Sequence, residues 1–144
     1  MPVEPGLIDA NVLVYAMDAD APQHVASRAL LESAHAAHTP VYVTLQTLCE
    51  FYSVVTNARR VSKPRSPADA VSAISSLLSF VHVLPIPAHT VDEVMDLLRR
   101  RPVTGGDVFD LQLIATMKAN GIFRIYTFNR EDFEPFSEIE VLAP

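Results

Sequence analysis

Polar residues able to donate oxygen ligands stand at the edges of several separate segments of this chain. Asp9 ends the first apolar run, Glu50 lies inside a helical pattern, and Asp110 stands at the start of another helix. Asn129 and Asp132 follow the last long apolar run. Carboxylates that follow strands in an alternating strand–helix chain can meet at the carboxyl ends of those strands, where open α/β sheets bind ligands. Because Mg²⁺ and Mn²⁺ prefer oxygen ligands, the set predicts a metal-dependent site.

Each of these residues also has an ordinary structural explanation. Asp9 could form a local turn with backbone amides, although its place at the end of a buried run favours a functional role. Glu50 shares a polar helix strip with Gln46, which a solvated glutamate explains equally well. Asp107 and Asp110 stand near a helix start, where acids cap the helix and complement its dipole, so we expect one of them to be a cap. The last two polar residues lie in a turn, where such residues are common.

Composition is typical of a folded domain. The chain has 144 residues, 49% of them hydrophobic and 19% charged, which predicts a single domain over residues 1–144 and excludes a disordered chain. Cys49 is the sole cysteine, which excludes an intrachain disulfide and favours a reducing compartment. No apolar run approaches the roughly 18–20 residues that cross a bilayer, and residues 1–5 lack the basic start of a signal peptide. We therefore expect a cytoplasmic protein without membrane attachment.

The charge balance opposes a general nucleic-acid binder. Seventeen acidic residues face eleven Lys and Arg, for a net charge of −6, whereas such binders usually carry a basic footprint. A metal-loaded acidic site could still receive phosphate if local basic patches guide the backbone. One candidate patch contains Arg59, Arg60, Lys63 and Arg65. It follows a helix, so complementing the helix dipole is an equally good explanation. The same explanation is strong for residues 99–101.

Apolar periodicity alternates between strand and helix patterns along the chain. The predicted strands cover residues 6–9, 41–43, 81–86, 122–128 and 139–142. Six helices are predicted. The first begins after Asn11, the second covers 22–37, the third includes 45–55, the fourth begins at Ser66, the fifth includes 91–98 and the sixth covers 107–120. Chains of this pattern form α/β domains, and we expect a mostly parallel sheet.

Four motifs occur in order along almost the whole chain. They are Leu7-Ile8-Asp9-Ala10-Asn11, Leu48-Cys49-Glu50-Phe51-Tyr52, Val108-Phe109-Asp110-Leu111 and Tyr126-Thr127-Phe128-Asn129. Each motif alone is weak, but their order and spacing resemble the PIN domain family and, within it, the VapC toxins of bacterial toxin–antitoxin pairs. The resemblance implies a three-layer α/β/α fold with a mostly parallel central sheet of about five strands.

The resemblance also implies an activity and partners. VapC toxins are endoribonucleases that depend on Mg²⁺ or Mn²⁺, are neutralised by a VapB antitoxin and are commonly dimeric. Asp9, Glu50 and Asp110 match the three central acids, which are expected to act in catalysis and bind metal. The supporting positions are Asn11, Thr44 and Thr127. If the chain acts on RNA, the basic patch described above supplies the candidate RNA-contacting residues, Arg59, Arg60, Lys63 and Arg65.

One position departs from the family pattern. Asn129 stands where many PIN domains carry a fourth acid, so it offers a carbonyl oxygen but no charge. Asp132 could replace that acid, and Asp107, one helical turn before Asp110, is a further candidate metal ligand. The departure favours operation with one metal ion. It also leaves open a catalytically degenerate PIN module that only binds a partner.

The acidic site also leads to an expectation about how an antitoxin would bind. An antitoxin segment is expected to place an arginine beside Asp9 and Asp110, because the guanidinium can pair with a carboxylate through two hydrogen bonds. The apolar anchors of that segment are expected near Leu30, Leu31, Leu48 and Tyr52.

A phosphoacceptor signalling domain also groups acids around Mg²⁺, but it needs an adjacent acid pair after the first strand, where this chain has Asp9 and Ala10.

Overall fold

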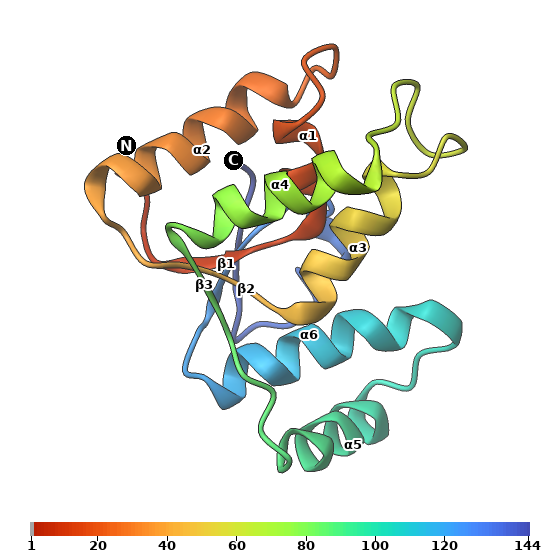
Figure 1. Ribbon diagram of the computed structural model, residues 1–144. Coiled ribbons are helices and arrows are strands. Elements are labelled where there is room, and N and C mark those ends of the chain that lie inside the picture. Colours follow the sequence, from red (N-terminus) through yellow and green to blue (C-terminus); the bar gives the residue numbers. More distant parts are fainter. Residues whose placement is uncertain (1) are drawn as a thin grey trace.

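Five short strands form the centre of the molecule (Figure 1). They are β1 (Gly6–Ile8), β2 (Val41–Val43), β3 (Val81–Val83), β4 (Arg124–Tyr126) and β5 (Glu140–Leu142). The sheet order is β3-β2-β1-β4-β5, and every neighbouring pair is parallel. This computed structural model describes residues 2–144, so Met1, where the predicted domain begins, lies outside the described residues. The predicted parallel sheet of about five strands is confirmed.

Six helices cover the two faces of the sheet. They are α1 (Ala10–Ala16), α2 (His24–Ala37), α3 (Leu45–Val55), α4 (Pro67–Leu78), α5 (Thr90–Arg100) and α6 (Val108–Ala119). In Figure 1, α1, α2 and α4 lie on one side of the strands, and α5 and α6 lie on the other. Two 3₁₀ turns, η1 (Gly105–Asp107) and η2 (Arg130–Asp132), precede α6 and follow β4. The predicted α/β/α layering is confirmed.

Alternation along the strands explains why there are two cores. Successive strand residues point to opposite faces, so Ile8 packs with α1 to α4 while Leu7 packs with α5 and α6. Tyr126 and Ile125 divide between the same two cores. Because both faces are covered, β1 and β2 in the middle of the sheet are mostly apolar.

Four of the five strands are shorter than the apolar runs that predicted them, and β2 matches the predicted residues 41–43. The run 81–86 yields a strand of three residues, because Pro85 cannot donate a ladder hydrogen bond. One more ladder hydrogen bond follows the last residue of β3, from the Leu84 N–H to the Val43 carbonyl at 2.8 Å. Past β4, the Thr127 N–H donates to the Leu142 carbonyl at 2.9 Å. The run 122–128 therefore delivers Thr127 to the sheet edge with its backbone still held.

Helix ends are set by local chemistry. Ser66 accepts a hydrogen bond from Asp69 N–H at 3.1 Å and so caps α4, as predicted. The helix expected at 107–120 begins one residue later, because Asp107 belongs to the 3₁₀ turn η1. Asp107 occupies the N-cap position of α6, as expected for one of the two acids, but its side chain makes no capping hydrogen bond, and Asp110 lies in the first turn. Within residues 2–144, no helix combines the length and the hydropathy needed to span a membrane.

Candidate active site

The polar site forms where the chain order of the sheet reverses. The first three strands run outward from β1 to β3, and the chain then returns to place β4 on the other side of β1. The carboxyl ends of the two strands beside this switch point form the usual ligand crevice of an open parallel sheet. Asp9 follows β1 directly and Thr127 follows β4 directly. The sequence thus delivers one acid and one hydroxyl to this crevice.

Asp9 is held by a closed set of hydrogen bonds. The Thr127 hydroxyl donates to Asp9 Oδ2 at 2.8 Å, and the Ala10 N–H donates to Asp9 Oδ1 at 2.8 Å. The Asn11 amide donates to Asp9 Oδ2 at 3.2 Å and to Thr127 Oγ1 at 3.1 Å. Asn11 Oδ1 in turn accepts from the Phe128 N–H at 3.1 Å. Asn11 therefore ties the start of α1 to the end of β4, and the buried carboxylate has one fixed orientation.

The other predicted ligands line a cleft beside Asp9. The cleft has a volume of about 570 Å³, and five carboxylates line it: Asp9, Asp18, Glu50, Asp110 and Asp132. Asn129 lines it as well. Asp9 is buried and Asp110 half-buried, whereas Glu50 and Asp132 are exposed. Residues that are far apart in sequence thus share one acidic hollow, as the strand-edge argument predicted.

Burial and crowding raise the pKa values of two of these acids. Burial, together with the charges of Asp132, Asp9, Asp107 and Glu50, raises the pKa of Asp110 to about 6. Burial likewise raises the pKa of Asp9, although its hydrogen bonds from Thr127 and Ala10 oppose the shift. Both shifts mean that the folded chain disfavours the ionised form of these two carboxyl groups. Such crowding of acids is typical of functional sites.

Glu50 reaches the cleft because α3 is fixed at its start. Thr44 follows β2 and accepts the Thr47 N–H at 3.1 Å, while the Thr47 hydroxyl reaches back to the Thr44 N–H at 3.4 Å. This capping box sets the direction of the helix. Thr44 itself does not line the cleft, so its contribution is to position α3. On the exposed strip, Gln46 donates to Glu50 Oε1 at 2.9 Å.

The acids do not form a closed set of metal ligands. Within residues 2–144, no three His, Cys, Asp or Glu side chains lie close enough together to hold one metal ion. The expectation of one coordination sphere around Asp9, Glu50 and Asp110 is not met in this conformation. Asp107 lies outside the cleft lining and acts on Asp110 only through its charge. The predicted residues are therefore neighbours across an open cleft, in which the Glu50 and Asp132 side chains are exposed.

The four basic candidates divide into different positions. Arg60 lines the acidic cleft, whereas Arg59, Lys63 and Arg65 do not. Lys63 pairs with Asp20 at 3.1 Å, and the Arg65 guanidinium donates to the Met17 carbonyl at 2.8 Å. The loop that carries them therefore rests against the loop after α1.

Two cleft residues were missed by the sequence interpretation, Tyr15 and Asp18. Both line the cleft from α1 or just beyond it. They follow Asn11 by four and seven residues, which is the spacing of one helix face. Extending that helical face from Asn11 could have found them. The Tyr15 ring packs edge-to-face on Phe128, with centroids 5.3 Å apart.

A second hollow lies between α1, α2 and α4, with a volume of about 540 Å³. Its apolar lining consists of Leu13, Ala16, Met17, Leu31, Ala73, Leu77 and Phe80. Of the four predicted antitoxin anchors, Leu31 alone belongs to this lining. Leu30 and Leu48 are buried in the core and Tyr52 packs against it, and none of the three lines the groove. Their role as anchors therefore stays a prediction.

Curated relatives with similar sequences are ribonucleases by name. The chain is 42% identical to ribonuclease VapC43 of Mycobacterium tuberculosis over 72 residues. That match covers 50% of this chain and about half of the relative, 49%. Ribonuclease VapC24 of the same organism is 28% identical over 138 residues, covering 95% of this chain and 94% of the relative.

Solved structures give the same fold. The VapC20 toxin of M. tuberculosis, described as cleaving the sarcin–ricin loop, aligns with a TM-score of 0.68 at 18% identity, covering 90% of this chain and 94% of that one. VapBC2 of Rickettsia felis, bound to a DNA fragment from its promoter, aligns with a TM-score of 0.69 at 17% identity, covering 97% and 98%. Finally, the sequence profile of the PIN domain matches residues 6–140. The chain therefore belongs to the PIN domain family.

Proposed function

We propose that this protein is a Mg²⁺- or Mn²⁺-dependent endoribonuclease that hydrolyses RNA phosphodiester bonds. The observation that carries the proposal is the meeting of Asp9, Glu50 and Asp110 in one cleft at the switch point of the sheet. The names of the relatives VapC43 and VapC24 support the same activity. Among the cleft acids, these three are the proposed catalytic residues.

The cleft suits a hard divalent ion by its chemistry. Its ligands are carboxylates, and the raised pKa of Asp110 marks a place where added positive charge is stabilising. Mg²⁺ usually keeps several of its waters and takes only one or two carboxylates directly. An open set of acids therefore fits such an ion, which Asp9, Glu50 and Asp110 would hold.

The chain's own residues then have distinct tasks. Thr127 and Asn11 keep the Asp9 carboxylate in one orientation, so that it need not reorganise when substrate arrives. Asp110 binds as the carboxylate, so the ion and the proton compete for it near its raised pKa. The ion, when bound, neutralises charge on the scissile phosphate and acidifies the attacking water. Expected products carry a 5′-phosphate and a 3′-hydroxyl.

Asn129 and Asp132 decide how many ions the cleft holds. Asn129 brings no charge, but Asp132 lines the same cleft and is the strongest of the neighbouring charges that raise the pKa of Asp110. We propose one tightly held ion, with Asp132 taking part of the role of the absent fourth acid. Asp107 acts only through its charge, which raises the pKa of Asp110.

We further propose that the protein is the toxin of a VapBC-type pair. Support comes from the solved complexes of similar fold, including VapBC2 of R. felis. An apolar helix of a VapB-type antitoxin fits the groove between α1, α2 and α4, since Leu31, Leu77 and Phe80 offer it apolar contacts. An arginine beyond that helix can then reach Asp9 and Asp110. A homodimer and a cytoplasmic location belong to the same proposal.

The activity is tested with purified protein and an end-labelled single-stranded RNA. Mg²⁺ or Mn²⁺ should support cutting, EDTA should stop it, and the new ends should be 5′-phosphate and 3′-hydroxyl. Asp9→Asn should abolish cutting, whereas Asp92→Asn, an exposed acid of α5, should not. Cutting that persists at full rate in EDTA would overturn the metal-dependent mechanism.

The partner is tested in cells and in solution. Expression of the chain alone should arrest growth, and co-expression with a neighbouring antitoxin gene should restore it. Leu77→Asp, a groove residue, should weaken antitoxin binding while RNA cutting remains. A complex that still cuts RNA at the free rate would exclude inhibition at the site. Light scattering measures whether the free protein is a dimer.

The alternative is a degenerate PIN module that binds a partner without catalysis. Its support is Asn129, which removes one charge from the family pattern. That reading predicts no cutting by the wild type with either ion, together with normal binding of the antitoxin by wild type and Asp9→Asn alike.

A further inference from the structure

The acidic cleft contains a single basic side chain. Among the described residues that line it, Arg60 alone is a lysine or arginine, and it faces a hollow with five carboxylates. Within residues 2–144 the Arg60 guanidinium forms no ion pair. An exposed arginine beside acids that do not neutralise it remains available to another partner.

The backbone of the loop fixes where Arg60 stands. The Arg60 and Val61 N–H groups donate to the Asn57 carbonyl at 2.9 and 3.1 Å. The Asn57 side chain accepts the Arg59 N–H at 2.9 Å. Farther along, the Arg65 N–H donates to the Val55 carbonyl at 2.7 Å. The turn therefore stands directly on the last turn of α3, the helix that carries Glu50.

The other cations of this loop are already engaged elsewhere. Lys63 reaches Asp20, and Arg65 reaches the Met17 carbonyl. The Lys63–Asp20 pair is exposed on both sides, at 84% and 73%, so it contributes little stability. The position of the contact is what matters, because the Lys63 and Arg65 side chains both reach the end of α1 or the loop after it. Arg59 does not line the cleft.

We propose that Arg60 binds a phosphate oxygen of the RNA strand where it crosses the cleft, and that Lys63 and Arg65 instead hold the loop. This inference rests on the proposed ribonuclease function. An RNA strand entering a hollow of five carboxylates is repelled unless a cation meets its backbone. Arginine suits that role because its planar fork donates two hydrogen bonds to one phosphate. The predicted four-residue RNA patch thereby reduces to one substrate-binding residue and two positioning residues.

The test measures RNA binding without cleavage. Asp110→Asn protein with Mg²⁺ is titrated with a labelled single-stranded RNA by fluorescence anisotropy, at several salt concentrations. Adding Arg60→Ala should weaken binding roughly tenfold, since one charge-assisted phosphate contact is lost. The slope of log Kd against log salt should fall by about 0.7, the value for one contact with a single strand.

Matched variants separate position from charge. Arg99→Ala, on the outer side of α5, should leave Kd unchanged, and Arg59→Ala should weaken binding less than about threefold. Arg60→Lys should recover part of the loss, because it restores the charge without the planar fork. Equal losses for Arg59→Ala and Arg60→Ala, or no loss for Arg60→Ala, would overturn the inference.

A parallel cleavage assay keeps the two proposals apart. In the otherwise wild-type protein, Arg60→Ala should raise KM with little change in kcat. If the wild type cuts RNA and Arg60→Ala changes neither constant, the assignment of Arg60 fails and the ribonuclease stands. If the wild type neither binds nor cuts RNA, both proposals fall. A melting temperature matching the wild type confirms that the variant is folded.

Discussion

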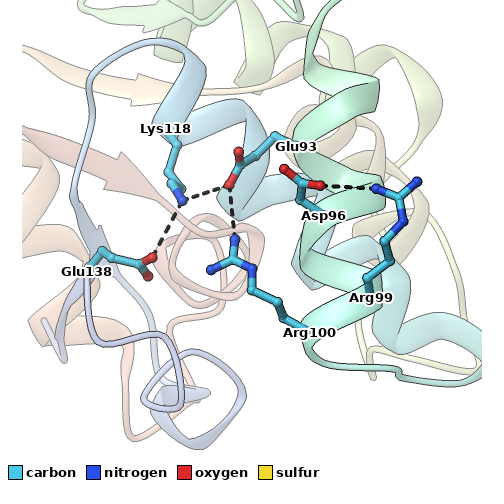
Figure 2. Close-up of polar contacts among 6 residues, drawn as sticks. All are labelled: Glu93, Asp96, Arg99, Arg100, Lys118 and Glu138. Atoms are coloured by element: carbon cyan, nitrogen blue, oxygen red, sulfur yellow. Dashed lines mark hydrogen bonds and ion pairs between the residues drawn. The ribbon is translucent and has the colours of Figure 1, made fainter.

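Two regions of the molecule treat their carboxylates in opposite ways. Between α5, α6 and the segment before β5, acids and bases are interleaved (Figure 2). Lys118 lies 2.7 Å from Glu93 and 3.5 Å from Glu138, and Arg100 lies 3.8 Å from Glu93. In the cleft, by contrast, five carboxylates and only one arginine are found among the described lining residues. The chain has bases to pair with acids, yet it places them away from the switch point.

The pKa shifts follow this difference. A hydrogen bond from its own backbone N–H, and then the Lys118 charge, hold the pKa of Glu138 below its usual value. The hydrogen bond to Glu93 raises the pKa of Lys118. Burial and like charges instead raise the pKa of Asp110 to about 6. Acids and bases of the paired network offset one another's charge, whereas burial and like charges disfavour the ionised form of Asp110 in the cleft.

The largest contrast is expected in catalysis. Asp110→Asn should slow RNA cleavage by about a hundredfold or more, since a proposed metal ligand and its charge are lost. Glu93→Gln in the paired network should leave the rate within about twofold, because it lies outside the cleft. Initial rates of RNA cutting measure both. Full activity in Asp110→Asn with loss in Asp107→Asn would reverse our assignment at this helix start.

Metal ions should stabilise one region and not the other. At about a hundred times Kd, Mg²⁺ or Mn²⁺ should add about 2.7 kcal/mol to the free energy of unfolding, raising the melting temperature by several degrees. Asp9→Asn should lose most of this increase, and Glu93→Gln should keep it. Thermal melts with EDTA and with each ion measure the shift. An equal shift in all three proteins would place the metal outside the cleft.

Breaking the paired network should cost stability without activity. Lys118→Met removes the shared partner of Glu93 and Glu138 and leaves them facing each other. We expect the free energy of unfolding to fall by about 1 kcal/mol, as the site is partly open to solvent. Urea unfolding gives the value, and RNA cutting should persist in the folded fraction. A loss of cutting beyond the loss of folded protein would connect the network to the cleft.

Metal-free stability should depend on pH through Asp110. Its folded pKa of about 6 lies above its ordinary value of 3.8, so the folded state binds the proton more tightly. Its ionisation therefore penalises folding fully above pH 6, and the penalty fades as pH falls towards 4. In EDTA, Asp110→Asn should be more stable than the wild type at pH 7.5, with the gap closing near pH 4. A gap of equal size at both pH values would contradict the crowding.

The smallest effect is expected at Asn129. Asn129→Ala should lower the cleavage rate by no more than about fivefold, because the residue is exposed and brings no charge. Asp132→Asn should lower it further, since Asp132 contributes charge to the same cleft. Comparing the two rates tests which residue replaces the fourth acid of the family pattern. A stronger effect at Asn129 would return that role to it.

The order of the elements could be predicted because apolar periodicity reports burial directly. Asp9 and Thr127 were within reach of that reasoning, since each lies at or near the end of a predicted apolar run and both runs end at the same sheet edge. Glu50 was not, because a polar helix strip looks the same whether it faces solvent or a cleft. The motif resemblance selected it, and the capping of α3 by Thr44 shows how it arrives there.

Other parts of the site depend on contacts that periodicity does not encode. The Lys63–Asp20 pair joins residues 43 positions apart, so the charge pattern alone could not separate Lys63 from Arg60. The lining of the groove is set in the same way. Leu30 and Leu31 are neighbours on α2 and are buried in the same core, but of the two only Leu31 also lines the groove beside α4.

The bond between Thr127 and Asp9 has a consequence for the synthesis of the protein. The two residues are 118 positions apart, and β4 must dock beside β1 before the hydroxyl reaches the carboxylate. A ribosome that has released residues up to 120 has already made Asp9, Glu50 and Asp110, but β4 has not yet been made. Asp9 then has at most its local hydrogen bonds from Ala10 and Asn11. The contact that fixes its carboxylate from across the sheet forms only when almost the whole domain has emerged.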